Sequence, residues 1–181
     1  MPSILKEKYT NEIRQSLQKE LGIKNINATP KVNKIVISTG IGDYKEEKET
    51  IADIKKNIAE FTGQAPKINL SKKAVSAFKL RIGQPVGLTV TLRDEKMYDF
   101  ISKLVNVAIP RIRDFKGLQN KSFDSKGNYV IGITDHSIMP EIKYENINKI
   151  FGFQINIQVS AKDKESSKAL LKALGFPFER D

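Results

Sequence analysis

The chain has 181 residues, enough for one domain with a real hydrophobic core, and 39% of them are hydrophobic. Its 31 Lys and Arg against 21 Asp and Glu give a net charge of +10, which makes nucleic acid the first partner to consider. There is no Cys, so disulfides and thiolate metal sites are excluded. The N-terminal residues lack an apolar signal region and no run approaches a membrane span, which predicts a cytoplasmic protein without a membrane partner.

The N-terminal segment predicts an amphipathic helix over residues 3–21, because apolar residues recur every four positions from Leu5 to Leu21 and Gly22 follows. Its other positions carry four cations, which form either a phosphate-facing side or an ordinary solvated helix face: Lys6, Lys8, Arg14 and Lys19. A β-branched run predicts a strand over residues 31–39 that leaves through a glycine-containing turn. Apolar residues at helical spacing predict the next helix from residue 46 to Phe61, and Thr62-Gly63 ends it. Six acids lie between Asp43 and Glu60, so this helix is expected to face away from any polyanion.

Residues 61–93 concentrate the charge, with six Lys or Arg and no Asp or Glu. Within this stretch, residues 71–84 mix cations with apolar residues in neither a strand nor a helix pattern and end in Gly-Gln-Pro. We interpret residues 71–84 as a long, mobile basic loop between two strands, suited to a polyanion. The alternative is a solvated loop whose lysines only maintain solubility.

The rest of the chain predicts further strands and helices. Alternation predicts strands at residues 86–93 and 153–160, and the turn at residues 124–128 leads into a further strand at 129–133. Asp94 is the expected N-cap of a helix that ends at Pro110, and a basic exit containing Arg111 and Arg113 follows. Residues 134–150 are expected to be irregular. A last helix over about 163–174 is expected to bury four residues: Ala169, Leu170, Ala173 and Leu174.

This order predicts a single α+β domain spanning residues 1–181, with a largely antiparallel sheet and helices on one face. The N-terminal helix (residues 1–22) and the basic loop (71–84) are parts of that domain. The opposite face of the sheet would carry uncharged polar side chains of modest size and one arginine, which suits contact with RNA backbone, 2′-hydroxyls and groove shape. The residues predicted on that face are Ser38, Thr89, Thr91, Arg93, Gln154, Asn156 and Gln158.

No pattern for catalysis or metal binding stands out in the sequence. The single histidine, His136, has no nucleophile elbow near it, and Ser76-x-x-Lys79 matches an acylating spacing without the companion motifs of that enzyme family. We therefore expect no catalytic residue, no metal and no cofactor. An RNA-modifying enzyme and a binder of membrane surfaces or acidic proteins remain as alternatives to an RNA-binding structural protein.

Three long segments resemble one known family: GQAPKINLSKKAVSAFKLRIGQPVGLTVTLRDEKMYDFISKL, AIPRIRDFKGLQNKSFDSKGNYVIGI and SKALLKALGFPF, with MPEI between the last two. They resemble the bacterial large-subunit ribosomal proteins that bind 5S rRNA, the fifth of the numbered series. The resemblance covers nearly the whole chain. It implies an α+β ribosomal protein, not an enzyme, located in the central protuberance beside other 5S-binding proteins.

The resemblance also implies partners and sites. The implied partners are 5S rRNA, a segment of 23S rRNA, P-site tRNA and a protein in the head of the small subunit. Sheet-borne RNA contacts would fall on Ser38, Gln64 and Thr91, although the family usually has Asn where this chain has Ser38. A serine reaches less far than an asparagine, so the contact is lost or bridged by water. The tRNA-facing loop would be residues 71–84, with Lys72, Lys73, Ser76, Phe78, Lys79 and Arg81 as its contact residues.

Overall fold

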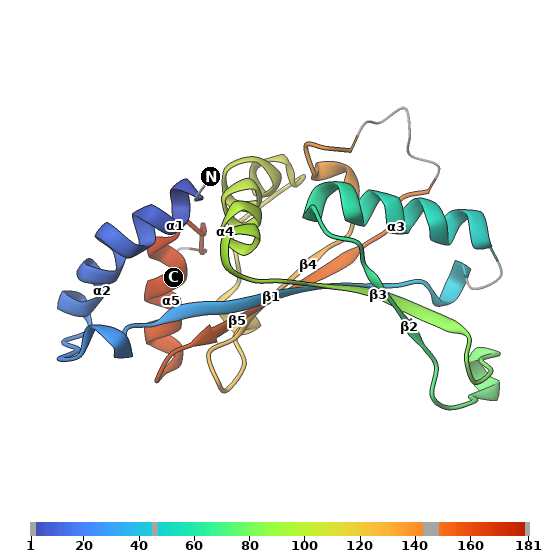
Figure 1. Ribbon diagram of the computed structural model, residues 1–181, viewed down its shortest axis with the longest axis horizontal. Coiled ribbons are helices and arrows are strands. Elements are labelled where there is room, and N and C mark those ends of the chain that lie inside the picture. The colour runs from blue at the N-terminus through green and yellow to red at the C-terminus, as the bar shows by residue number, and fades with distance from the viewer. Residues whose placement is uncertain (1–2, 45–46, 143–148, 180–181) are drawn as a thin grey trace. The chain divides into compact units, whose positions relative to one another are not determined.

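The structure is a computed structural model that describes residues 3–44, 47–142 and 149–179 (Figure 1). Strands among these residues form one five-stranded sheet in the order β2-β3-β1-β5-β4. Its strands are β1 (Lys31–Gly40), β2 (Lys67–Leu70), β3 (Pro85–Leu92), β4 (Tyr129–Ile133) and β5 (Phe153–Ser160). Backbone hydrogen bonds join the end of β1 to the start of β3 and the end of β4 to the start of β5, as antiparallel neighbours require. The predicted α+β class with an antiparallel sheet is confirmed.

The helices follow the predicted order, although their ends differ from the prediction by a few residues. They are α1 (Ile4–Lys8), α2 (Arg14–Glu20), α3 (Lys48–Thr62), α4 (Asp94–Lys103) and α5 (Lys164–Ala173). The strands predicted at residues 129–133 and 153–160 match β4 and β5 residue for residue. The predicted start of α3 at residue 46, and part of the segment expected to be irregular at 134–150, lie outside the described residues.

The chain divides into two compact units. The first unit comprises Met1–Ile35, Leu92–Ile131 and Asn156–Asp181, and the second comprises Val36–Thr91 and Gly132–Ile155. The first unit contains the N-terminal helices, α4 and α5. The second contains α3 and the β2–β3 hairpin, which carries most of the residues that the sequence selects for RNA contact.

The core of the second unit lies between α3 and one face of its strands. Ile54, Ile58 and Phe61 of α3 are buried, and the Phe61 ring lies 5.2 Å from the ring of Phe153 on β5. Burying such side chains stabilises the fold by about 1.5–3 kcal/mol each. Gly63 ends α3 in the left-handed conformation (φ 66°), where its N–H donates to the carbonyl of Ala59, so the glycine stop read from the sequence is confirmed.

The N-terminal helix of the first unit contains one π-helical turn, Tyr9–Ile13, between α1 and α2. Apolar side chains spaced strictly four residues apart drift by about 40° per step around an ideal α-helix. A wider π turn reduces this drift and keeps Tyr9, Ile13 and Leu17 on the buried face. The predicted single helix is therefore correct in extent but not in regularity.

One local prediction in the first unit is wrong and another is half right. Asp94 is not the N-cap of α4: β3 ends at Leu92, Arg93 occupies the cap position, and Asp94 begins the helix with a positive φ of 51°. In α5, Leu170 and Leu174 are buried as predicted, whereas Ala173 is exposed and Ala169 only half-buried. The other buried side chains of α5 are Ser167 and Leu171.

Candidate nucleic-acid interface

The sheet of the second unit has one apolar face and one polar face. Side chains that point toward α3 are buried, among them Ile37 of β1 and Leu88 and Val90 of β3. Because strand side chains alternate, the residues between them point to the opposite face and are partly exposed. Apart from Val36 and the glycines, this face carries Ser38, Lys67, Asn69, Thr89, Thr91 and Gln154. It contains one cation and no carboxylate.

Asn69 and Thr89 form the best-defined pair on this polar face. The Asn69 Nδ2 donates a hydrogen bond of 2.5 Å to the Thr89 Oγ1. The Thr89 hydroxyl oxygen is thereby used as an acceptor, which leaves its own hydrogen to donate outward. Asn69 keeps its Oδ1 as an acceptor. The pair therefore presents one oriented donor and one oriented acceptor to a partner lying on the sheet.

Gln64 and Thr91 form a second pair, which brings together two residues selected from the sequence. Gln64 follows the Gly63 stop of α3, and its Nε2 donates to the backbone carbonyl of Thr91 over 3.3 Å. The bond holds the side chain of Gln64 against the backbone of β3 at Thr91. Ser38, on β1, lies on the same polar face between the buried Ile37 and Thr39. Hydroxyl and amide donors without neighbouring carboxylates suit the phosphate and ribose oxygens of RNA.

Asn69 and Lys67 belong to this face but were missed in the sequence. They reach it because β2 pairs antiparallel with β3, with Lys67 opposite Thr89 and Asn69 opposite Gly87. These four residues alternate between polar and apolar side chains, but the run is too short to predict a strand by itself, and the register with β3 assigns Lys67 and Asn69 to the polar face. Gly87 leaves this position of the polar face without a side chain, and a Cβ there would lie only 3.0 Å from the Thr39 carbonyl oxygen.

The segment expected to be a long irregular loop, residues 71–84, is folded as an extension of the β2–β3 hairpin. Val75 and Leu80 exchange backbone hydrogen bonds of 3.0 Å in each direction, around a 3₁₀ turn at Ser76–Phe78. Lys79 closes this turn in the left-handed conformation, with φ 48°. A four-residue turn ending in such a residue is a standard hairpin connection. At the base, Ser71 and Gln84 pair through Ser71 N–H and the Gln84 carbonyl.

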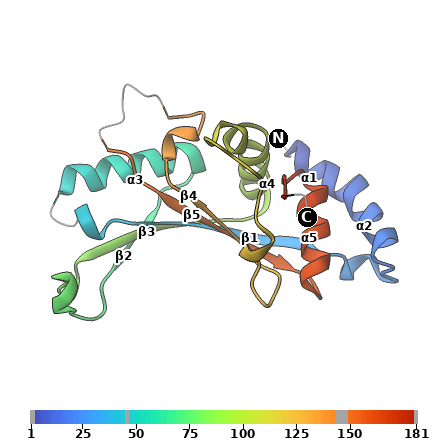
Figure 2. The same cartoon turned by 180° about the vertical axis from the view of Figure 1, so that it is seen from behind.

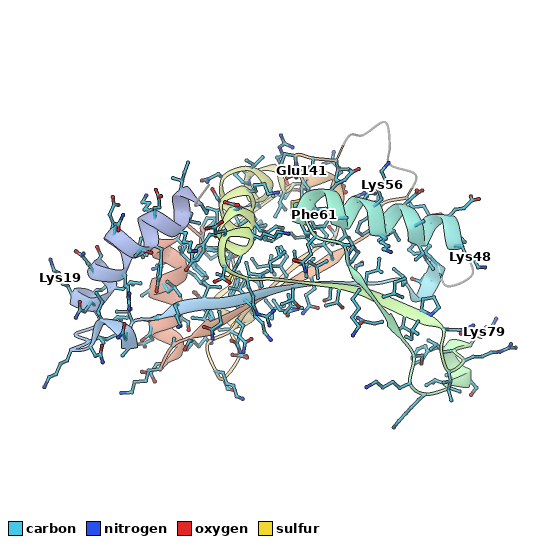
Figure 3. The ribbon with its side chains drawn as sticks, viewed as in Figure 1. Lys19, Lys48, Lys56, Phe61, Lys79 and Glu141 are labelled. Carbon is cyan, nitrogen blue, oxygen red and sulfur yellow. The ribbon has the colours of Figure 1, made fainter. Side chains whose placement is uncertain are left out.

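The extension of the hairpin at residues 71–84, here called the hairpin tip, carries both charge and exposed apolar surface. It projects from the second unit on the side away from α3, with Lys79 at its far end (Figures 2 and 3). The four cations of the tip, Lys72, Lys73, Lys79 and Arg81, are all exposed, as is Ser76. Phe78 and Ile82 are 72% and 71% exposed. A hollow of about 700 Å³ lies within the tip, and Lys79, Arg81 and Gln84 contribute to its lining.

Three arginines selected from the sequence belong to the first unit. Arg93 precedes α4, Arg111 ends a 3₁₀ turn after it, and Arg113 follows in the next turn, and all three are exposed. Arg93 was predicted to extend the polar face of β3, but β3 ends one residue earlier. Asn156 and Gln158 of β5 also belong to the first unit. The polar cluster of the second unit therefore consists of residues from β1, β2, β3, the start of β5 and the turn that follows α3.

Groups that could support catalysis or metal binding do not assemble in the described part of the chain. His136 is fully buried, its ring stacks on Phe151 with centroids 4.0 Å apart, and burial lowers its pKa below the usual value. No cluster of three metal-ligating side chains occurs among the described residues. The described residues also contain no helix that is long and apolar enough to cross a membrane.

Comparison with known proteins identifies the family. Residues 25–81 match the model described as ribosomal protein L5, and residues 85–178 match that of the ribosomal L5P family C-terminus. The chain belongs to the ribosomal protein L5 family. The first matched region ends within the hairpin tip, at residue 81, and the second begins at Pro85, the first residue of β3. The resemblance stated from sequence motifs is confirmed, and members of this family are ribosomal proteins, not enzymes.

Curated relatives support the family over the full chain. Large ribosomal subunit protein uL5c of Gracilaria tenuistipitata var. liui is 48% identical over 178 residues, covering 98% of this chain and 99% of that protein. Large ribosomal subunit protein uL5 of Halothermothrix orenii is 46% identical, and that of Synechococcus sp. is 47% identical, with the same coverage. The family pattern thus extends through both units.

Proposed function

We propose that this L5-family protein is a structural constituent of the large ribosomal subunit that binds 5S rRNA through the polar sheet face of its second unit. The observation that carries the proposal is the cluster of oriented hydroxyl and amide groups around Thr89 and Thr91, on a face without a carboxylate. Such groups match the acceptor-rich backbone and the 2′-hydroxyls of RNA. The flat, non-aromatic surface favours recognition of groove shape over stacking of unpaired bases.

The hairpin tip is proposed to contact the elbow of P-site tRNA. Four exposed cations within ten residues provide a sequence-independent attraction to phosphates. The hollow lined by Lys79 and Arg81 offers a concave surface for a ribose-phosphate ridge, and the exposed Phe78 ring supplies an apolar contact beside it. Because the tip is a folded hairpin with paired backbone, it reaches a partner with little additional ordering.

The remaining contacts complete the proposed role in the central protuberance. A segment of 23S rRNA is proposed to meet the exposed Arg93, Arg111 and Arg113 of the first unit, while neighbouring 5S-binding proteins and a protein of the small-subunit head meet other surfaces. These proposals rest on the family to which the chain belongs.

The test uses two variants that separate the sheet face from the hairpin tip. The first, Thr91→Val, removes one hydroxyl from the face and keeps the shape of the side chain. The second replaces Lys72, Lys73, Lys79 and Arg81 by glutamine. We expect Thr91→Val to weaken binding of purified 5S rRNA, measured with excess tRNA as competitor, and the charge-neutral hairpin to retain most of that affinity. On assembled ribosomes the hairpin variant should weaken P-site tRNA protection, whereas equal loss of 5S affinity in both variants would refute two separate surfaces.

The exposed Phe78 and Ile82 among cations also fit a membrane surface in principle. Titration of the purified protein with anionic vesicles at about 150 mM salt addresses that alternative, since screening at this ionic strength weakens attraction by charge alone. We expect no binding that survives this salt, and binding that is abolished by Phe78→Ala would instead favour a membrane-surface role.

A further inference from the structure

The first unit holds an arginine whose charge is fixed in place but not neutralised. The Arg14 guanidinium donates to three neutral oxygens: the Ile26 carbonyl at 3.1–3.2 Å, the Asn27 Oδ1 at 2.7 Å and the Thr29 Oγ1 at 3.3 Å. No carboxylate of the described residues lies within ion-pair distance of Arg14. These bonds use the Nε and Nη2 atoms and leave the Nη1 edge for another acceptor. An arginine held by neutral partners is preorganised for an anion.

Arg14 lines a groove between the N-terminal helix and the start of β1. One hollow, of about 290 Å³, is lined by Arg14, Lys31, Tyr9, Asn27 and Thr29 and contains no carboxylate. A second hollow of similar volume shares Tyr9 and Lys31 and continues along the helix. The two hollows therefore adjoin each other at Tyr9 and Lys31, and we refer to them together as the groove.

The floor of the groove is rigid. The Tyr9 hydroxyl donates to the carbonyl of Pro30 at 2.8 Å, and the Tyr9 ring stacks on that of Tyr98 with centroids 5.8 Å apart. Burial, followed by the neighbouring Tyr9 and Asp94, raises the pKa of Tyr98 to about 12. Both phenols therefore stay neutral at physiological pH, so the net positive charge of Arg14 and Lys31 is not reduced by the floor.

The two hollows differ in the charges of the residues that line them. The first has two cations and suits a phosphate. The second is lined by Thr10, Asn33, Lys6 and Asp94, and Lys6 lies 3.7 Å from the Glu95 carboxylate, so its cationic charge is balanced. Asp94 accepts hydrogen bonds from hydroxyl groups such as those of a ribose, whereas it would repel the side chains of an acidic peptide.

We propose that this groove, the Arg14 groove, binds the ribose-phosphate backbone of ribosomal RNA, with a phosphate between Arg14 and Lys31 and the adjoining ribose beside Asp94. The site is separate from the polar sheet face and does not depend on what that face binds. It gives the N-terminal helix a defined RNA contact at Arg14, where the sequence leaves the four cations as either a phosphate-facing side or a solvated helix face. Of its cations, Arg14 faces the groove, whereas Lys19 points outward from α2 (Figure 3).

The first test measures how much the charge of Lys31 contributes to RNA binding. Lys31 is exposed, and Lys31→Gln removes its charge without removing any hydrogen bond recorded for the fold. Binding of the full chain to purified 5S rRNA and, separately, to purified 23S rRNA is followed across a salt series. On one of these RNAs the slope of log affinity against log salt should fall by about 0.7–0.9, the value of one phosphate contact. Lys19→Gln is the matched control and should leave both slopes unchanged, whereas unchanged slopes for Lys31→Gln on both RNAs would overturn the proposal.

A second test identifies the occupant in assembled large subunits. A photoreactive amino acid replaces the exposed Asn33 at the rim of the second hollow, and Gln15 on the solvent side of the helix serves as the control position. We expect a crosslink from position 33 to RNA and none, or a weaker one, from position 15. A crosslink from position 33 to protein, or no crosslink, would refute RNA as the occupant. Failure of Thr91→Val to affect 5S binding would challenge only the sheet face, since the slope difference between Lys31→Gln and the parent and the crosslink from position 33 both report on the groove.

Discussion

Replacement of Thr89 by valine tests the polar sheet face at its best-defined hydrogen bond. The change keeps the β-branched shape that suits a strand but removes the oxygen that accepts from Asn69 Nδ2 at 2.5 Å and the hydrogen that points outward. In the free protein both groups are partly exposed, so water can replace the lost bond and the expected loss of stability is about 0.5–1.5 kcal/mol. In the complex the RNA group facing Thr89 would be buried without a partner, which costs about 1–3 kcal/mol.

The expected weakening of 5S rRNA binding is therefore about 5- to 150-fold, measured by filter binding with excess tRNA as competitor. Thr50→Val is the matched control, because its hydroxyl also bonds a side chain, that of Glu47, but lies on α3. A double-mutant cycle with Asn69→Ala should show that the two losses are not additive, since each removes the same oriented pair. Affinity of Thr89→Val within twofold of the parent, with unchanged folding, would refute the assignment of this face to 5S rRNA.

Two further predictions concern stability. Burial lowers the pKa of His136, so near pH 6.5 the unfolded chain takes up a proton that the folded chain does not. The free energy of unfolding should therefore fall below that pH, by at most about 1.4 kcal/mol per pH unit. In urea titrations His136→Gln should abolish this pH dependence, and an unchanged pH profile would contradict the prediction. Gly127 has φ 79°, and a Cβ at this position would lie only 2.3 Å from the Ser167 Oγ. Gly127→Ala should therefore lower the free energy of unfolding by about 1–3 kcal/mol. Gly132→Ala is the control: a Cβ at Gly132 meets open space, so its effect should be much smaller, and equal effects of the two variants would argue against the clash.

The architecture was predictable where a pattern is carried by consecutive residues. The alternation in β5 and the turn that precedes β4 give the bounds of these strands directly, and the Gly63 stop of α3 has a conformational cause that the sequence shows. The hydroxyl face followed from the same alternation, because knowing which residues of β3 are buried determines that Thr89 and Thr91 are not.

Features that depend on pairing between distant residues could not be read from the sequence. Asn69 meets Thr89 only through the register of β2 with β3, and Arg14 meets Asn27 through the return of the chain after α2. The hairpin tip was interpreted as irregular because its turn is closed by Lys79 in a left-handed conformation, where glycine or asparagine would have signalled it.

The two proposed surfaces would contribute to RNA binding in different ways, which a net charge of +10 leaves undivided. Cations on the hairpin tip attract any polyanion and lose their effect as salt rises, so they supply affinity and association rate more than selectivity. The hydroxyl and amide groups of the sheet face are little affected by salt, but each requires a partner at a fixed position, and that requirement discriminates between RNA shapes. Raising the salt should therefore weaken tRNA binding before 5S rRNA binding, and the ratio of the two affinities should increase with ionic strength. A ratio that stayed constant would mean that charge governs both contacts and that the polar face adds no selectivity.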